Sequence, residues 1–247
     1  MDRERFRTIC RSHVDQQRQI NGIGTLGERT LHAVLKDYFS ADTSEQEIRV
    51  GGFVADIVCD GEIIEIQTRA FDKLRKKLDV FLEQGKVTVV YPVSRIKRLC
   101  WIDQDTGEIT GNRKSPKIGA PCEILFELYR IRKNLCHPNL TFCIMWVDMT
   151  EYRNLNGWSR DKKKGATRFD RIPVDLIEEI YIASPADYLR LIPEYLDGVF
   201  TSRQFAKVSK LTLSTAQTAL LVLYHVGAVR RVGKDGNAFL YEKTVFR

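Results

Sequence analysis

Two carboxylates, Asp56 and Glu65, have the clearest chemical potential in this 247-residue chain. They flank Asp60-Gly61, a dipeptide that strongly favours a two-residue β-hairpin turn between Val- and Ile-rich runs. In that register Asp56 faces Glu65, with about 5 Å between their Cβ atoms. Like charges directly opposite each other destabilise a hairpin. A cation between them reverses that effect, and paired carboxylate oxygens suit Mg²⁺. The spacing therefore predicts a magnesium site, at which Mn²⁺ would be able to substitute.

The alternation of side chains across the two runs supports a site that is partly shielded from solvent. One face of the predicted hairpin carries Val54, Asp56, Val58, Ile63, Glu65 and Gln67, and the other carries Ala55, Ile57, Ile64 and Ile66. The second face is apolar and suits packing under a helix. Three aliphatic residues accompany the acids on the first face, which argues against the alternative, a solvated face whose two acids merely tolerate each other.

The pattern of Asp56, Glu65 and Gln67, D-x8-E-x-Q, resembles the active site of the PD-(D/E)XK nuclease superfamily. The resemblance implies that the Asp and the Glu hold the metal, with the backbone carbonyl of Ile66 as a further oxygen. The third position is usually Lys in that superfamily, and Gln67 departs from the pattern. Gln67 would orient the attacking water but would not supply the positive charge of a Lys.

Three further residues enter the expected site through the same resemblance. Glu28 stands near the start of an amphipathic segment, residues 25–39, at the place where the superfamily often carries a third acid; an acid there also suits the helix dipole. Glu28 would reach the metal through water or complete a second metal site. Arg69 and Lys73, just beyond the hairpin, are candidates for the missing positive charge and for contacts with nucleic acid, the alternative being a solvated helix start.

The elements that must position this site follow from hydrophobic periodicity. A helix over residues 71–84 and a buried strand over 86–92 follow the hairpin, and a helix between strands requires a crossover to a parallel neighbour. The expected fold is α/β, a mixed, restriction-endonuclease-like sheet flanked by helices. The remaining expected elements are a helix over 2–20, a strand over 47–50, one or two strands over 95–109, a helix over 121–133, a strand over 140–148 and helix over 172–196.

The net charge of +7 favours a polyanionic partner, and the distribution of bases indicates where it would bind. A polar, Gly-containing stretch over 154–171 is expected to be a loop that lines a phosphate backbone. Its candidate contacts are Arg160, Lys162, Lys163, Lys164 and Arg168. The alternative is a solvated linker with a positive bias.

Residues 197–247 form a second expected domain, beside a nuclease-like domain over 1–196. Two predicted helices followed by a two-stranded hairpin resemble the winged-helix family. The resemblance implies duplex DNA binding through the start of the second helix and through the wing, although winged helices also mediate protein contacts. The candidate contacts are Ser214, Thr215, Gln217, Arg230, Arg231 and Lys234.

The rest of the composition restricts the setting. The six cysteines include no C-x-x-C pair, so we expect free thiols in a reducing, cytoplasmic compartment. The N-terminal segment is too charged for a signal peptide, and no apolar run approaches a membrane span, so no membrane partner is expected.

Together these features predict a Mg²⁺-dependent DNA endonuclease that hydrolyses phosphodiester bonds. Two alternatives stay open: a catalytically silent nuclease fold that binds DNA or regulates, and an enzyme that cleaves RNA. The D-x8-E-x-Q motif occurs once, so each chain would have one active site and would cleave one strand. A double-strand break would then require a homodimer.

Overall fold

The computed structural model describes residues 1–21, 30–157 and 165–246, which form two compact units. The first unit comprises Met1–Glu47, Pro92–Gly119 and Met145–Glu179, and the second comprises Ile48–Tyr91, Ala120–Ile144 and Ile180–Arg247. The expected carboxylate hairpin belongs to the second unit.

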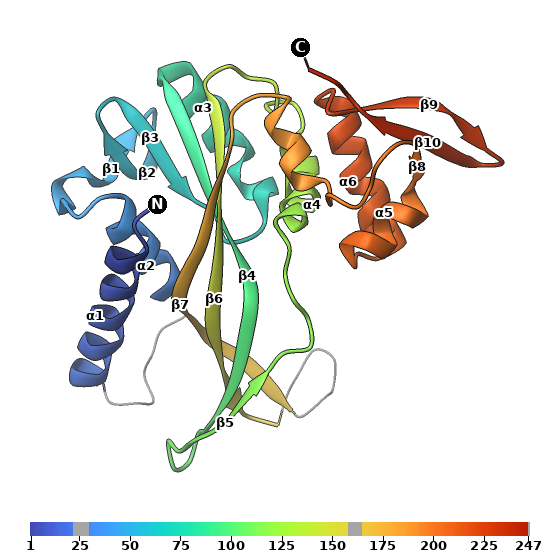
Figure 1. Ribbon diagram of the computed structural model, residues 1–247. Helices are drawn as coiled ribbons and strands as arrows, with labels where there is room; N and C mark the ends of the chain where they lie inside the picture. Colours follow the sequence, from blue (N-terminus) through green and yellow to red (C-terminus); the bar gives the residue numbers. More distant parts are fainter. Residues whose placement is uncertain (22–29, 158–164, 247) are drawn as a thin grey trace. The chain divides into compact units, whose positions relative to one another are not determined.

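A mixed sheet is the main element of the fold (Figure 1). In the described residues it has seven strands, with β5 (Ile109–Lys114) paired to β4 beside the main order β1-β2-β3-β4-β6-β7. The strands in that order are β1 (Gln46–Val50), β2 (Phe53–Cys59), β3 (Glu62–Ile66), β4 (Lys86–Asp103), β6 (Leu140–Leu155) and β7 (Ala166–Ile182). The expected mixed α/β class is confirmed.

The expected crossover between parallel strands is also confirmed. β3 pairs with β4 in parallel, and the connection contains η2 (Phe71–Leu74) and α3 (Arg75–Gln84). α3 buries Leu78, Phe81 and Leu82, the apolar stripe that its 3.6-residue period predicts. This packing matters for the site because it fixes which residues of α3 lie against the hairpin.

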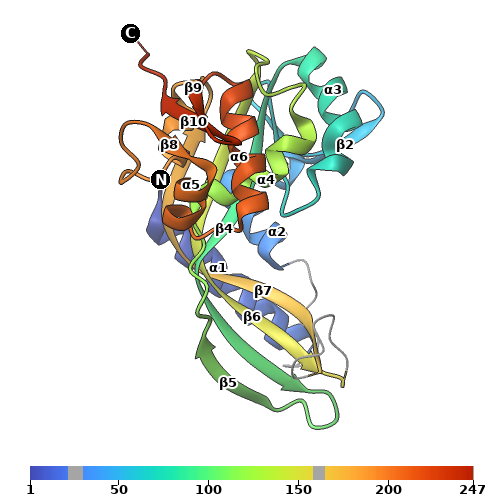
Figure 2. The ribbon, with the colours of Figure 1, turned by 90° about the vertical axis from the view of Figure 1, so that its right-hand side faces the viewer.

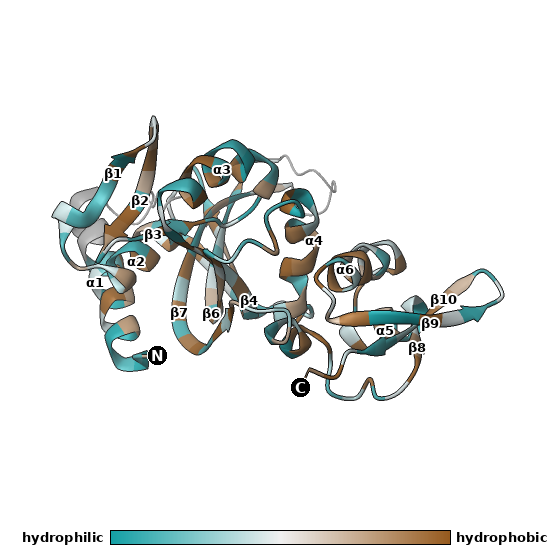
Figure 3. Ribbon diagram, turned by 90° about the horizontal axis from the view of Figure 1, so that it is seen from above, coloured by the Kyte–Doolittle hydropathy of each residue, from teal (hydrophilic) through white to brown (hydrophobic). Residues whose placement is uncertain are grey.

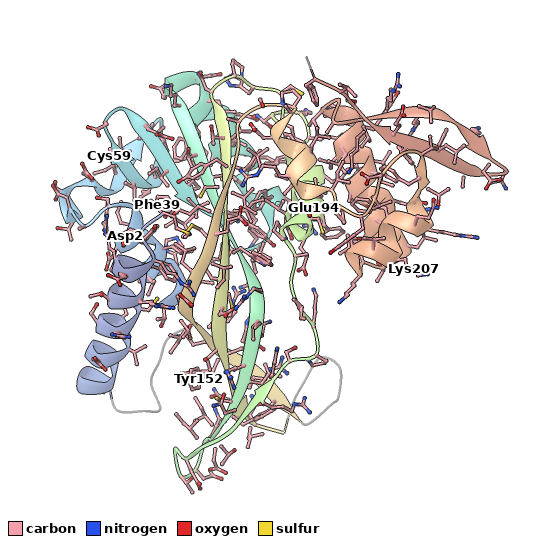
Figure 4. The ribbon with its side chains drawn as sticks, in the orientation of Figure 1. Asp2, Phe39, Cys59, Tyr152, Glu194 and Lys207 are labelled. Atoms are coloured by element: carbon pink, nitrogen blue, oxygen red, sulfur yellow. The ribbon has the colours of Figure 1, made fainter. Side chains whose placement is uncertain are left out.

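The first unit begins with two helices, α1 (Arg3–Asn21) and α2 (Thr30–Phe39), followed by η1 (Thr43–Glu45). Figure 4 labels Asp2 at the start of α1 and Phe39 at the end of α2. The Asp2 N–H donates to the Tyr38 hydroxyl at 2.9 Å, and the ring of Tyr38 packs edge-on against Phe6. Residues 25–29 of the predicted second helix lie outside the described residues.

The buried carboxyl of Asp170 gives the first unit a pH-dependent stability. Its Oδ2 accepts from Thr30 Oγ1 at 2.5 Å and its Oδ1 from Arg171 N at 2.7 Å, yet burial raises its pKa to about 6. Because the folded pKa exceeds the unfolded one, the folded state favours the protonated carboxyl. Its contribution to the free energy of unfolding is full below about pH 4 and is lost as pH rises through about 6, by up to about 3 kcal/mol. We expect Asp170→Asn to lack this loss in urea unfolding measured from pH 4 to 8. An identical pH dependence in the two proteins would contradict the assignment.

The predicted helix over 172–196 is wrong. Residues up to Ile182 belong to β7, and a short η5 (Asp187–Leu191) follows. Ile172, Leu176 and Ile180 are buried, and their spacing of four fits one face of a helix and one face of a strand equally well. The expected loop over 154–171 is likewise strand at both ends, in β6 and β7.

Two other expected elements have different limits. The strand expected to end at Pro92 continues to Asp103, because β4 pairs with β3 up to Val90 and with β5 from Arg98, which leaves Pro92 between the two pairings. The expected helix over 121–133 is divided into η3 (Pro121–Glu123), α4 (Ile124–Leu128) and η4 (Tyr129–Ile131).

The C-terminal segment of the second unit contains two helices and a three-stranded sheet. These are α5 (Ser202–Ser209), α6 (Leu213–His225), β8 (Phe200–Thr201), β9 (Val229–Asp235) and β10 (Ala238–Lys243), with strand order β8-β10-β9. Thr201 and Gln204 form a capping box on α5. Thr212 caps α6. Figure 3 shows the hydrophobic stretch of α6 in brown, and its buried side includes Ala219 and Leu223.

In the described part of the chain, no helix combines the length and hydrophobicity that a bilayer crossing requires.

Candidate active site

The hairpin of β2 and β3 has the register that its turn predicts. Ile57 pairs with Ile64, Val58 with Ile63, and Cys59, labelled in Figure 4, with Glu62. Asp60 and Gly61 both have positive φ, 50° and 76°, as a type I′ turn requires.

The two carboxylates of the hairpin are buried. Asp56 is 9% exposed and Glu65 is 4% exposed, which excludes the solvated hairpin face for the folded chain. Asp56 Oδ2 accepts a hydrogen bond from the Ile66 N–H at 2.7 Å. The Asp56 side chain thus reaches across to β3, next to Glu65.

A lysine that was not among the predicted site residues lies beside these two carboxylates. Lys77 Nζ, from the first turns of α3, contacts Glu65 Oε1 at 2.5 Å and lies 5.4 Å from the centre of the Phe81 ring. The other oxygen, Glu65 Oε2, is buried and accepts no hydrogen bond from any described residue. The sequence contained a usable signal: Lys77 lies three residues after Leu74 and four before Phe81, on the edge of the buried stripe of α3.

The electrostatics of the cluster follow from its burial and its charge. Desolvation and then the neighbouring Asp56 raise the pKa of Glu65, and the Lys77 ammonium opposes that rise. When both acids are ionised, the two carboxylates and the one ammonium carry an excess of one negative charge in a buried place. A bound cation would remove that excess and would satisfy the unpaired Glu65 oxygen.

Gln67 is held by its own loop. Its Nε2 donates to the carbonyls of Arg69 and Ala70 at 2.5 and 3.3 Å, and its backbone N–H donates to Val90. Ala70 has a φ of +59°, an unfavourable value for a residue with a Cβ, so Gln67 stabilises a strained turn into η2. This is a structural role beside the water-orienting role that the motif implies.

The structure brings only part of the predicted site together. Asp56, Glu65 and Gln67 lie on one hairpin, and Arg69 and Lys73 are exposed just beyond it. Glu28, Arg160, Lys162, Lys163 and Lys164 lie outside the described residues, and Arg168 is exposed in the first unit. Within residues 1–21, 30–157 and 165–246, no three His, Cys, Asp or Glu side chains form a group suited to a metal.

The predicted C-terminal contacts divide into two sets. Ser214, Thr215 and Gln217 lie in the first turn and a half of α6, where Ser214 and Gln217 are exposed. In the hairpin, Arg230 forms an ion pair with Glu242 at 2.6 Å, and Lys234 lies over Phe239. Arg231 lies over the rings of Tyr224 and Phe239.

Residues 29–183 match the family described as Domain of unknown function (DUF8091). The chain belongs to this family. The match contains the hairpin acids and Lys77, and it ends before α5, so the C-terminal helices and their sheet lie beyond the DUF8091 segment.

One curated relative has a similar sequence. An uncharacterized protein of Treponema pallidum (strain Nichols) is 38% identical over 144 residues, which are 57% of this chain and 57% of that protein. The chain thus spans little more than half of the length of that relative. No solved structure matches the chain.

Proposed function

We propose that this DUF8091 protein is a metal-dependent phosphodiesterase that cleaves DNA. The observation that carries the proposal is the buried cluster of Asp56, Glu65 and Lys77, in which one Glu65 oxygen has no partner among the described residues. Buried charges are normally paired, and an unpaired carboxylate oxygen beside a second carboxylate has an evident use as a cation ligand.

The donor set fits a hard divalent cation such as Mg²⁺. Asp56 and Glu65 would hold it, with the Ile66 carbonyl and, from outside the described residues, Glu28 as further candidates. When bound, such a cation supplies Lewis-acid polarisation of a phosphate and lowers the pKa of a coordinated water.

The protein's own groups orient the acids and place charge beside them. The Ile66 N–H holds Asp56 Oδ2, and Lys77 holds Glu65 Oε1, so that both carboxylates are oriented before a ligand arrives. Lys77 also supplies, beside Glu65, the positive charge that Gln67 lacks. A fixed positive charge stabilises the negative charge that develops when a phosphodiester is attacked.

DNA is the proposed substrate because of the basic C-terminal helices and hairpin, whose layout is similar to a winged helix. Arg203, Lys207 and Lys210 are exposed on and just after α5, and Figure 4 labels Lys207 there. Exposed bases of this kind contact phosphates without reading sequence.

One observation favours the alternative of a silent nuclease-like scaffold. Gln67 Nε2 donates to the carbonyls of Arg69 and Ala70, so this nitrogen of the third motif residue has a structural role in the described conformation. The two functions differ in whether a divalent cation binds at the hairpin.

Metal binding is the direct test of the proposal. We expect Mg²⁺ or Mn²⁺ to raise the thermal midpoint of the wild type on the order of 5 °C, because a ligand of the folded state stabilises it. Asp56→Asn preserves the acceptor for the Ile66 N–H but removes a charge, so the rise should vanish while the metal-free midpoint is kept. An equal rise in both proteins would exclude the hairpin as the metal site.

A further inference from the structure

Two hollows in the surface of the second unit meet at the same pair of residues, Tyr129 and Arg132. One, of about 380 Å³, extends along Arg75 and Lys133. The other, of about 620 Å³, extends along Tyr224 and Arg231. Their elements, α4 with η4 on one side and α6 with β9 on the other, lie in one unit, and Figures 1 and 2 show α4 and α6 side by side. Together the two hollows form the Tyr129 groove.

The charge of the Tyr129 groove is strongly positive. Its lining includes Arg75, Arg132, Lys133 and Arg231, and no Asp or Glu in the described part of the chain lines the larger hollow. Asp79 lines the smaller one, where it accepts from Asn134 Nδ2 at 2.7 Å. Arg130, which also lines it, is already paired with Asp72 and Glu127.

Each of two tyrosine rings in the groove has an arginine guanidinium over it. Arg132 lies 5.1 Å from the Tyr129 ring centre and donates to its hydroxyl at 3.0 Å. Arg231 lies 4.5 Å from the Tyr224 ring centre and 3.9 Å from that of Phe239, and its Nε is buried without a hydrogen-bond partner among the described residues. These cation–π contacts restrain each planar cation, so less entropy is lost when it binds an anion.

The rings themselves stay accessible. Tyr129 is 37% exposed and Tyr224 is 45% exposed, and Leu221 is exposed beside them. A duplex offers phosphates but keeps its bases stacked on each other, so it would leave these rings without a partner. A single strand offers phosphates to the arginines and free base faces to the rings.

We infer that the Tyr129 groove binds a short single-stranded segment of nucleic acid. The bases stack on Tyr129 and Tyr224, and the phosphates pair with Arg132 and Arg231. This goes beyond the proposed cleavage, because it requires neither the carboxylates nor a divalent cation. Oligonucleotide binding is therefore measured in EDTA, which removes divalent cations. A failure of binding in the groove is then distinguished from a failure of the proposed metal-dependent cleavage.

The test is fluorescence anisotropy of the full chain with a labelled twelve-nucleotide oligothymidylate. We expect Tyr129→Ala and Tyr224→Ala each to weaken binding about tenfold, since one base–aromatic stack is lost. Arg132→Gln should weaken binding and lower the salt slope by about 0.7, since one phosphate contact is lost. Each variant should keep the wild-type thermal midpoint because the three side chains are exposed.

The matched control is Tyr195→Ala, which removes a tyrosine that is 90% exposed and lines neither hollow. It should bind the oligonucleotide as the wild type does. Equal affinities of Tyr195→Ala, Tyr129→Ala and Tyr224→Ala would overturn the inference. Displacement of the oligonucleotide by an equal concentration of a twelve-residue oligoglutamate would also overturn it, since the groove would then recognise an acidic peptide.

Discussion

Replacement of Glu65 by Gln is expected to lower metal-dependent DNA cleavage by about a hundredfold to a thousandfold, the scale on which a lost catalytic electrostatic contact reduces a rate. The substitution keeps the size of the side chain and removes one of the two buried negative charges. Asp56 and Lys77 then balance each other, so the fold should be kept. The measurement is the initial rate of nicking of supercoiled plasmid with Mg²⁺ or Mn²⁺, at equal protein concentration.

Glu83→Gln is the matched control for this experiment. Glu83 is an exposed acid on α3 in the same unit, so its removal changes the net charge equally and leaves the hairpin intact. It should cleave at the wild-type rate. If Glu65→Gln also cleaved at that rate, the reaction would not use this hairpin, whereas no cleavage by any protein, wild type included, would favour the silent scaffold.

Replacement of Lys77 is expected to lower both the stability of the fold and the rate of cleavage. Lys77→Met leaves the buried Glu65 carboxylate without its ammonium partner, and removal of one partner of a buried ion pair costs about 3 to 5 kcal/mol. We expect a loss of about 3 kcal/mol in the free energy of unfolding in urea with EDTA. Mg²⁺ should restore a large part of it, because a bound cation replaces the missing charge. Cleavage should fall even with saturating metal, since the charge beside Glu65 is lost.

Two variants isolate the origin of that loss. Lys76→Met changes the exposed neighbour on α3 and should alter stability by no more than about 0.5 kcal/mol. In the double variant Lys77→Met with Glu65→Gln, most of the Lys77→Met loss should disappear, because the Glu65 charge that Lys77 balanced is gone. An equal loss in the single and the double variants would show that Lys77 acts through its packing on Phe81 and not through Glu65.

Local patterns in the sequence determined the hairpin that carries the acids. Asp60-Gly61 sets the turn and thereby the register, and strict alternation then places Asp56 and Glu65 on the same face. The parallel pairing of β3 with β4 followed in the same way, because a helix between two strands leaves little other choice. These features depend on residues close together in the sequence, so their physics could be evaluated without the fold.

Tertiary packing decided the rest. Lys77 lies twelve positions after Glu65, and only the docking of α3 on the sheet brings the ammonium to the carboxylate. The strand at Ile172–Ile182 was decided by its neighbours in the sheet, since a spacing of four between buried residues suits both periods. The Tyr129 groove, likewise, joins residues about 95 positions apart, in η4 and α6, whose adjacency no local period encodes. Burial, which removes the screening by water, is what turns two ordinary acids of the sequence into a charged site.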